Sequence, residues 1–198
     1  ENLFLRDSLF EIPQYVRGGH DPVQIIPGTG LSDKGDHDNY LRLIHHAKDH
    51  VYIQTPYFIP DDSILDALKI EAVGVDVRIM IPCKPDHPFV YWATYSYIGE
   101  MVAAGAKCYV YDKDFFSKDF VGGWTGGVRW DCNMDIRSFA LNFEVNATIY
   151  SERTVGRLEA AFENDITKCK QVTRKVYDER SLLIRAKEQF SRLLSPLL

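Results

Sequence analysis

The stretch Val75-Asp76-Val77-Arg78-Ile79-Met80-Ile81 decides the fold of this chain. Its β-branched and apolar residues are typical of a strand in a sheet, and Pro82 ends the strand because proline cannot donate to the sheet ladder. A helix is predicted over 88–104, since Pro88 suits a first helical turn and Gly105 suits the position after the last turn. A strand followed by a helix is the repeating unit of α/β proteins.

Further strands and helices are predicted on both sides of this unit. The predicted strands cover 22–26, 51–55, 107–111 and 140–150, and the predicted helices cover 39–48, 61–70, 154–169 and 173–194. The alternation of the two element types predicts an α/β sandwich with helices on both faces of the sheet. Residues 114–132 follow neither period, and we assign them no element.

The pattern contains no internal repeat and no linker that would divide the chain. We therefore predict a connecting segment over 1–21, one lobe over 22–170, and a C-terminal helix over 171–198. Because the first residue is Glu1 and no signal segment precedes it, the sequence is typical of a fragment or a processed product.

Composition sets limits on the function. The chain has 198 residues, 45% of them hydrophobic and 13% aromatic, which is ample material for a core. Its net charge of −5 argues against binding nucleic acid by general phosphate attraction. The sequence contains no run of about 18 apolar residues, so it predicts no helix that spans a membrane. The cysteines are widely spaced and predict free thiols rather than a zinc site; they are Cys83, Cys108, Cys132 and Cys169.

Five stretches of the chain carry a resemblance to one known family. They are Tyr52–Asp61, Ile81–Tyr97, Asn133–Phe139, Leu141–Asn146 and Phe190–Pro196. Over most of 20–198 the chain resembles the phospholipase D superfamily and, more narrowly, the C-terminal half of bacterial cardiolipin synthases. The resemblance implies a single α/β lobe with a mixed sheet flanked by helices. It also implies a membrane location on the cytoplasmic side, with the membrane anchors and a first catalytic lobe outside this sequence.

The family resemblance implies a reaction without metal or cofactor. Two copies of the motif HxKxxxxD, one per lobe, transfer a phosphatidyl group between two phosphatidylglycerols and release glycerol. One histidine attacks phosphorus, and the other protonates the leaving alkoxide and then activates the second hydroxyl. The lysine and a following asparagine neutralise the phosphoryl oxygens, so protein cations supply the charge stabilisation.

The second motif departs from this pattern. Counted back from Asn133, its lysine falls on Lys118, its histidine on Phe116 and its aspartate on Gly123. Lys118 and Asn133 therefore remain as candidate catalytic residues, with Glu144 as the carboxylate behind them. Taken without the resemblance, Lys118 is an exposed cation and Glu144 a solvated residue on the polar face of its strand. A chain that lacks the histidine and the aspartate is expected to be inactive by itself.

The segment after Lys118 suggests a hypothesis about its coding sequence. Codons permitted for 118–132, read one base later, can encode K-T-L-L-V-D-G-Q-V-A-S-V-G-T-A, which includes the aspartate at the required spacing. We hypothesise two compensating frame errors, near Phe116 and near Cys132; the alternative is a natural glycine-rich loop in a decayed paralogue. In either case the four glycines of this segment predict a poorly formed central strand, while the flanking elements keep their fold.

Two further regions are candidates for lipid contact. By resemblance, Tyr57, Lys84 and His87 lie near the lipid substrate. The predicted helix over 88–104 is rich in aromatic residues, which suit either the core or a membrane interface. The C-terminal helix places six cations among apolar residues, either on a solvated face or against an anionic membrane surface; they are Arg174, Lys175, Arg180, Arg185, Lys187 and Arg192.

Three functional interpretations stay open at this point. The first is the C-terminal lobe of a cardiolipin synthase with a disrupted motif, acting on phosphatidylglycerol together with its missing N-terminal lobe. The second is a non-catalytic scaffold that has kept the phospholipase D fold. The third, a phospholipase D-type nuclease, is disfavoured by the acidic net charge and by the aromatic run over 84–97.

Overall fold

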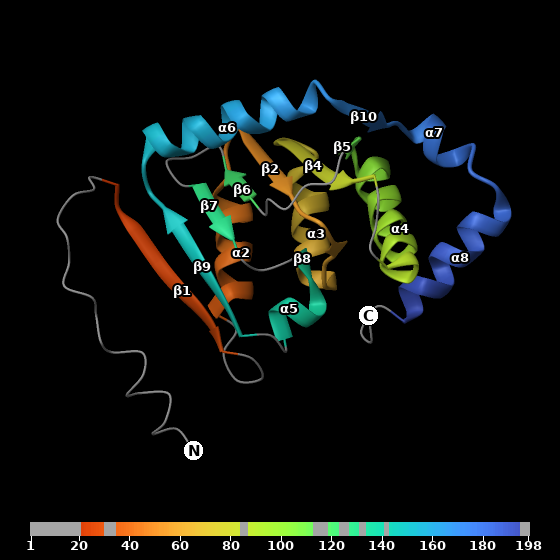
Figure 1. Ribbon diagram of the computed structural model, residues 1–198, viewed down its shortest axis with the longest axis horizontal. Helices are drawn as coiled ribbons and strands as arrows, with labels where there is room; N and C mark the ends of the chain where they lie inside the picture. Colours follow the sequence, from red (N-terminus) through yellow and green to blue (C-terminus); the bar gives the residue numbers. More distant parts are fainter. Residues whose placement is uncertain are drawn as a thin grey trace, which may run out of the picture.

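A mixed sheet of eight strands forms the centre of the protein in a computed structural model (Figure 1). The structure describes residues 21–29, 35–83, 87–112, 119–122, 127–130, 134–140 and 143–194. The strands are β1 (Val23–Thr29), β2 (His50–Gln54), β3 (Phe58–Ile59), β4 (Asp76–Pro82), β5 (Lys107–Tyr111), β6 (Asp119–Gly122), β7 (Gly127–Trp130), β8 (Met134–Asp135), β9 (Phe143–Ile149) and β10 (Cys169–Val172). The helices are α2 (Gly35–His46), α3 (Asp62–Glu71), α4 (Pro88–Ala104), α5 (Ile136–Ala140), α6 (Glu152–Ile166), α7 (Arg174–Asp178) and α8 (Leu182–Leu193).

The strand order in the large sheet is β1-β9-β7-β6-β2-β4-β5-β10. The neighbours β2, β4 and β5 are parallel, because α3 and α4 carry the chain back between them, and every other pair in this sheet is antiparallel. The two short strands β3 and β8 form a separate parallel pair. The predicted α/β architecture, with a mixed sheet and flanking helices, is confirmed.

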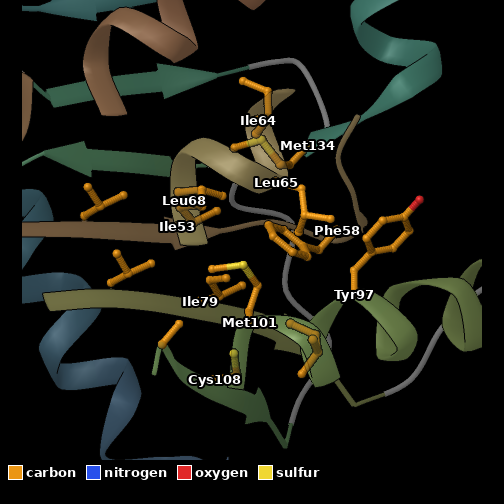
Figure 2. Packing of buried hydrophobic residues seen from close by; sticks show 14 of the residues in the cluster. Ile53, Phe58, Ile64, Leu65, Leu68, Ile79, Tyr97, Met101, Cys108 and Met134 are labelled. Carbon is orange, nitrogen blue, oxygen red and sulfur yellow. The ribbon is translucent and has the colours of Figure 1, made fainter. Parts of the chain in front are cut away.

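The larger core lies between the sheet and the helices α2, α3 and α4. Alternate residues of the strands supply one side, and the apolar faces of the helices supply the other (Figure 2). Ile53 and Ile79 are adjacent on β2 and β4 and are at most 1% exposed. The N-terminal start of α3 is fixed by Asp61, whose carboxylate accepts a hydrogen bond from the backbone N–H of Ile64 at 3.0 Å.

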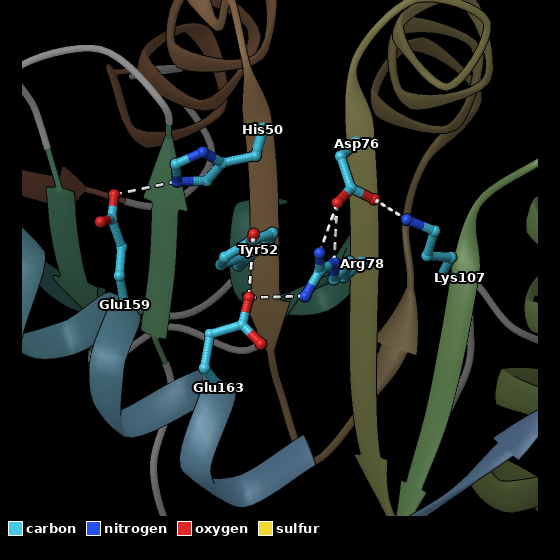
Figure 3. Close-up of polar contacts among 7 residues, drawn as sticks. All are labelled: His50, Tyr52, Asp76, Arg78, Lys107, Glu159 and Glu163. Atoms are coloured by element: carbon cyan, nitrogen blue, oxygen red, sulfur yellow. Dashed lines mark hydrogen bonds and ion pairs between the residues drawn. The ribbon is translucent and has the colours of Figure 1, made fainter. Parts of the chain in front are cut away.

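A second, smaller core joins α6 to the opposite face of the sheet. The ring of Tyr52 stacks on Phe162 at a centroid distance of 4.8 Å, and burial raises the pKa of Tyr52 to about 12. The Arg78 guanidinium lies over the Tyr52 ring and donates to Glu163 of α6 at 2.6 Å and to Asp76 at 2.6 Å and 2.9 Å (Figure 3). Helix α6 is thus held by both stacking and charge.

The C-terminal helices pack along α4 rather than along the sheet (Figure 1). Three cations of this region stack on aromatic rings. Arg180 lies 4.4 Å from the ring centre of Tyr95, and Lys187 lies 5.0 Å from that of Trp92. Arg192 lies 4.5 Å from the ring centre of Tyr97. None of the helices in the described ranges is long and apolar enough to cross a membrane.

Several predicted boundaries were wrong. Helix α2 begins at Gly35 rather than Asn39, because the acidic residues at 36 and 38 are compatible with a helical first turn. The strand predicted over 140–150 is β9, which begins at Phe143, and Ala140 ends the short helix α5. The predicted helix over 154–169 starts two residues earlier and ends at Ile166, and an unpredicted edge strand, β10, follows it.

The predicted C-terminal helix is also two helices. Ser181 interrupts it by capping α8, as its hydroxyl accepts from the backbone N–H of Ile184 at 3.4 Å. Helix α7 has its own cap at Thr173. Two N-cap residues within one apolar periodicity therefore mark two helices, although neither glycine nor proline separates them.

The expected failure of the glycine-rich strand is corrected as well. Strand β6 pairs with both β2 and β7, and β7 pairs with β9, so the sheet is continuous through this region. Ladder pairing needs only backbone N–H and C=O groups, and Phe120, Val121 and Val128 are good strand formers. Gly122 is the last residue of β6 and Gly127 the first of β7, and glycine weakens a strand least at its ends.

Candidate functional site

The candidate site begins at the C-terminal end of β2. Thr55 follows this strand and is 3% exposed. Its hydroxyl donates to the backbone carbonyl of Tyr57 at 2.8 Å and accepts from the backbone N–H of Met134 at 3.3 Å. One side chain therefore joins the end of β2 to the start of β8. In α/β sheets, the C-terminal ends of parallel strands are where ligands bind.

The sequence neighbours of both predicted motif residues meet at this end. Lys118 and Asn133 lie outside the described residues, as do the positions of the missing histidine and aspartate, Phe116 and Gly123. Asp119, which follows Lys118, pairs with Gln54, the last residue of β2. Met134, which follows Asn133, is 2% exposed and lies against Thr55.

Strand β9 brings a third set of predicted polar residues to the sheet. Glu144 lies on β9 opposite Gly28, and its side chain is outside the described set. Asn146 and Thr148, which alternate with Glu144 on the same face, are fully buried. This face of β9 is therefore buried at Asn146 and Thr148, and the solvated position of the Glu144 side chain stays a prediction. Helix α2 covers this face, and Asn39 Nδ2 of that helix donates to Thr148 Oγ1 at 3.2 Å.

Asn146 is a buried polar residue that the sequence analysis left without a role. Neither its amide nitrogen nor its amide oxygen has a hydrogen-bond partner among the residues that the structure describes. Its strand position is opposite Trp130 of β7. An unsatisfied buried amide is costly in a folded protein.

A pocket opens where β2 and β4 end and α4 begins. It has about 230 Å³ of space between its walls, part of it open to solvent, and its lining is mostly apolar. Tyr57, a predicted substrate-binding residue, lines it, together with Pro56, Ile81, Pro82, Val90, Tyr91 and Thr94. Such walls suit an aliphatic or aromatic portion of a ligand better than a phosphate.

The other two predicted substrate-binding residues are not part of this lining. His87 is exposed and occupies the N-cap position of α4 without a capping hydrogen bond from its side chain. Lys84 lies outside the described residues. Among the residues that the structure describes, no group of three or more His, Cys, Asp or Glu side chains is arranged to hold a metal ion.

A polar cluster beside this region was missed by the sequence analysis. His37 Nε2 lies 2.8 Å from Asp61 Oδ2 and 2.9 Å from Ser63 Oγ, and its ring packs edge-on against Phe139. His37 and Ser63 are 26 positions apart. The only local signal was the Asp61-Asp62-Ser63 helix start, which indicates a cap but not a histidine partner.

Comparison with known proteins identifies the family. A family model described as "Cardiolipin synthase, PLD-like domain" matches residues 40–166. A cardiolipin synthase of Oceanobacillus iheyensis is 48% identical over 93% of this chain, and "Cardiolipin synthase 1" of Staphylococcus aureus is 44% identical over 91%. The chain spans only 39% and 37% of the lengths of these two relatives.

Solved structures support the fold alone. The phospholipase D family member Nuc from Salmonella typhimurium superposes with a TM-score of 0.65 at 16% identity, covering 77% of this chain and 99% of that one. The phosphatidylserine synthase of Haemophilus influenzae superposes with a TM-score of 0.69 at 14% identity, covering 88% of this chain and 45% of that one. By its sequence match and its architecture, the chain belongs to the cardiolipin synthase family of phospholipase D-like domains.

Proposed function

We propose that this chain is the C-terminal lobe of a cardiolipin synthase, with residues 22–170 as the lobe, and that it is inactive alone. The observation that carries the proposal is the 48% identity to a cardiolipin synthase over 93% of the chain. The span of 39% of that relative leaves room for a second lobe. The assembled enzyme would act at the membrane on phosphatidylglycerol.

The proposed reaction is a phosphatidyl transfer in two steps. An imidazole nitrogen forms a bond to phosphorus while the bond from phosphorus to the glycerol oxygen breaks, and a second imidazole gives that oxygen its proton. The hydroxyl of a second phosphatidylglycerol then displaces the imidazole and gives its proton to the second histidine. In this scheme Lys118 and Asn133 neutralise the phosphoryl oxygens, and Glu144 orients the half-site.

Local geometry supports a half-site at the end of β2. The residues that follow Lys118 and Asn133 both lie there, beside a pocket lined by Tyr57. This chain has phenylalanine at 116 and glycine at 123 in place of the imidazole and the carboxylate. A benzene ring neither attacks phosphorus nor transfers a proton, and loss of such a group costs on the order of a million-fold in turnover.

The test is co-expression of this chain with the N-terminal lobe of a related synthase. Cardiolipin formed from purified phosphatidylglycerol is measured by mass spectrometry. We expect none from the chain alone, and we expect product when the double variant Phe116→His/Gly123→Asp meets the other lobe. A matched control, Phe115→His/Gly122→Asp, places the same groups one position earlier and should give none.

Two outcomes would decide against catalysis by this scheme. Cardiolipin made by the unaltered chain in the absence of the other lobe would overturn the proposed inactivity. A repaired variant that associates with the other lobe but stays inactive would favour the non-catalytic scaffold. The substitutions at 116 and 123 are the observation that keeps this second function open.

A further inference from the structure

Helix α8 packs with its polar face inward and its apolar face outward. The buried residues of α8 are Glu188 and Ser191. In contrast, Leu182, Leu183 and Leu193 are between 77% and 80% exposed, and Phe190 is 58% exposed. These positions recur at helical spacing and form one stripe, which we name the α8 apolar face: Leu182, Leu183, Ala186, Phe190 and Leu193.

The orientation of α8 is fixed by specific polar contacts with α4 and α7. Glu188 is fully buried and pairs with Arg180, and it accepts from the Tyr177 hydroxyl at 3.3 Å. Arg192 pairs with Glu100 of α4, and Gln189 donates to Ser96 at 3.4 Å. Rotation of α8 to bury its leucines would break all of these contacts, so the apolar face stays outward.

The exposure is concentrated in this part of the molecule. Eleven large apolar side chains are exposed among the residues that the structure describes, and four of them lie on the α8 apolar face. An exposed apolar stripe of this kind marks an interaction surface rather than ordinary scatter.

The charge around the α8 apolar face indicates the chemistry of its partner. Residues 173–194 carry six cations and three carboxylates, although the whole chain has a net charge of −5. Arg180 and Arg192 are engaged in the inward pairs with Glu188 and Glu100, so the cations beside the apolar stripe are fewer than six. Arg185 and Lys187 are exposed and flank the apolar stripe on its two sides. Their aliphatic stems can follow an apolar surface while the charged ends reach an anionic layer. Symmetric contact with a second copy would instead oppose like charges.

From these observations we propose that the α8 apolar face docks on the surface of an anionic lipid bilayer. The docking of this face is supported by its exposure and by the charges beside it. The choice of phosphatidylglycerol as the anionic lipid rests on the proposed function. The helix lies in the interface, with its leucines and phenylalanine among the acyl chains and its cations at the headgroups.

This docking would set the pocket beside the lipid surface. Lys187 stacks on Trp92, whose ring centre lies 5.5 Å from that of Phe89, a residue 43% exposed at the start of α4. The next residues of α4, Val90 and Tyr91, line the pocket. A lipid drawn from the bilayer would therefore have a short path to it.

The test is co-sedimentation of the 198-residue chain with vesicles of phosphatidylcholine containing phosphatidylglycerol. We expect the variant Leu183→Ser/Phe190→Ser to bind at least about tenfold more weakly, because two large apolar side chains no longer enter the bilayer. The control Ile70→Ser/Val73→Ser removes side chains that are 66% and 86% exposed elsewhere. It should bind like the unaltered chain. Arg185→Gln should weaken binding about fivefold, as should the loss of any one cation near the surface.

Three outcomes would overturn the docking proposal. The first is equal binding by the unaltered chain and by the leucine–phenylalanine variant. The second is binding to pure phosphatidylcholine vesicles that equals binding to vesicles containing phosphatidylglycerol, because the partner would then not need to be anionic. The third is self-association in sedimentation velocity that the same variant abolishes without affecting vesicle binding, which assigns the face to a second copy. None of these readouts needs turnover, so the test stands apart from that of the proposed function.

Discussion

At the scale of single residues, His37 and Asp61 form a charged contact between the first turns of α2 and α3. The hydrogen bond with Asp61 raises the pKa of His37 above its ordinary value of 6.5, although desolvation opposes it. Burial disfavours the Asp61 carboxylate, but hydrogen bonds from His37, Ser63 and the backbone N–H of Ile64 outweigh it and hold the Asp61 pKa well below its usual range. The contact is therefore an ion pair whenever His37 is protonated.

The variant His37→Gln tests this ion pair through the pH dependence of stability. A raised histidine pKa stabilises the fold fully below about pH 6.5, and the stabilisation is lost as the pH rises through the folded-state value. A lowered aspartate pKa stabilises above about pH 4 and loses its effect as the pH falls. We expect the unaltered chain to exceed the variant by about 1–2 kcal/mol in unfolding free energy near pH 5.5, and by less near pH 8.5, in urea titrations.

The matched control for this prediction is His45→Gln. His45 is 52% exposed, and its Nδ1 lies 3.5 Å from Glu71. An exposed pair of this kind contributes little, so the control should follow the unaltered chain at both pH values. A stability difference for His37→Gln that stays constant between them would contradict the ion-pair assignment.

Sequence reasoning assigned roles to single residues only where a local motif was present. Tyr57 was named as a substrate-binding residue from such a stretch; it lines the pocket, and its role there stays a prediction. The burial of Asn146 was not predicted, because alternation alone directs the more apolar side of a strand toward the core. Here α2 covers the polar side, and the hydrogen bond from Asn39 to Thr148 depends on residues 109 positions apart. No local pattern contains that information.

At the scale of elements, Gly99 of α4 lies directly against the ring of Tyr177 in α7. A Cβ atom at this position would overlap the ring of Tyr177. That ring donates its hydroxyl to Glu188 of α8, so it cannot move without disturbing the buried Glu188–Arg180 pair. We expect Gly99→Ala to lower the unfolding free energy by about 1–3 kcal/mol in urea titrations, despite the better helix propensity of alanine.

The chain offers a control within another helix. Gly156 lies in α6, and a Cβ atom there would meet nothing within 4 Å. Gly156→Ala should therefore stabilise the protein by about 0.5–1 kcal/mol. Combining Gly99→Ala with Tyr177→Ala should cost less than the sum of the two single changes. A Gly99→Ala variant as stable as Gly156→Ala would refute the close approach.

Whole elements were predictable where several local signals agreed. Helix α4 has proline in its first turn, an aromatic and aliphatic body, and Gly105 at its end with a positive φ of 106°, and its predicted bounds are those observed. Strand β10 carries no such signal: four residues with one buried side chain pair only with β5 at the sheet edge. Its existence depends on a long-range partner, which propensity does not describe.

At the scale of the whole molecule, local alternation predicted the α/β class but not the sheet order. The parallel neighbours β2, β4 and β5 follow from strand–helix–strand connections. The insertion of β6 between β2 and β7, and of β9 between β7 and β1, joins segments distant in sequence. The six exposed large apolar residues of α7 and α8 could not be interpreted from local sequence either, because their role depends on a surface outside the chain.

The segment 118–132 leads to a prediction for the molecule as a whole. Replacing it with the frame-shifted text would put valine at 122 and alanine at 127, where glycine now stands in β6 and β7, and glycine at 130, where tryptophan now ends β7. The two strands would thus hold one glycine instead of two. Each glycine in a strand costs roughly 0.5–1 kcal/mol, so the replaced chain should gain about 0.5–1 kcal/mol of unfolding free energy from this difference. A gain of that size raises the melting temperature by roughly 1–4 °C in a chain of this length, measured by circular dichroism. A control that changes only 124–126, between the two strands, should gain little. A replaced chain that melted at or below the melting temperature of the present chain would show that the sheet is adapted to the glycine-rich sequence. Decay in a paralogue would then explain this segment better than a frame error.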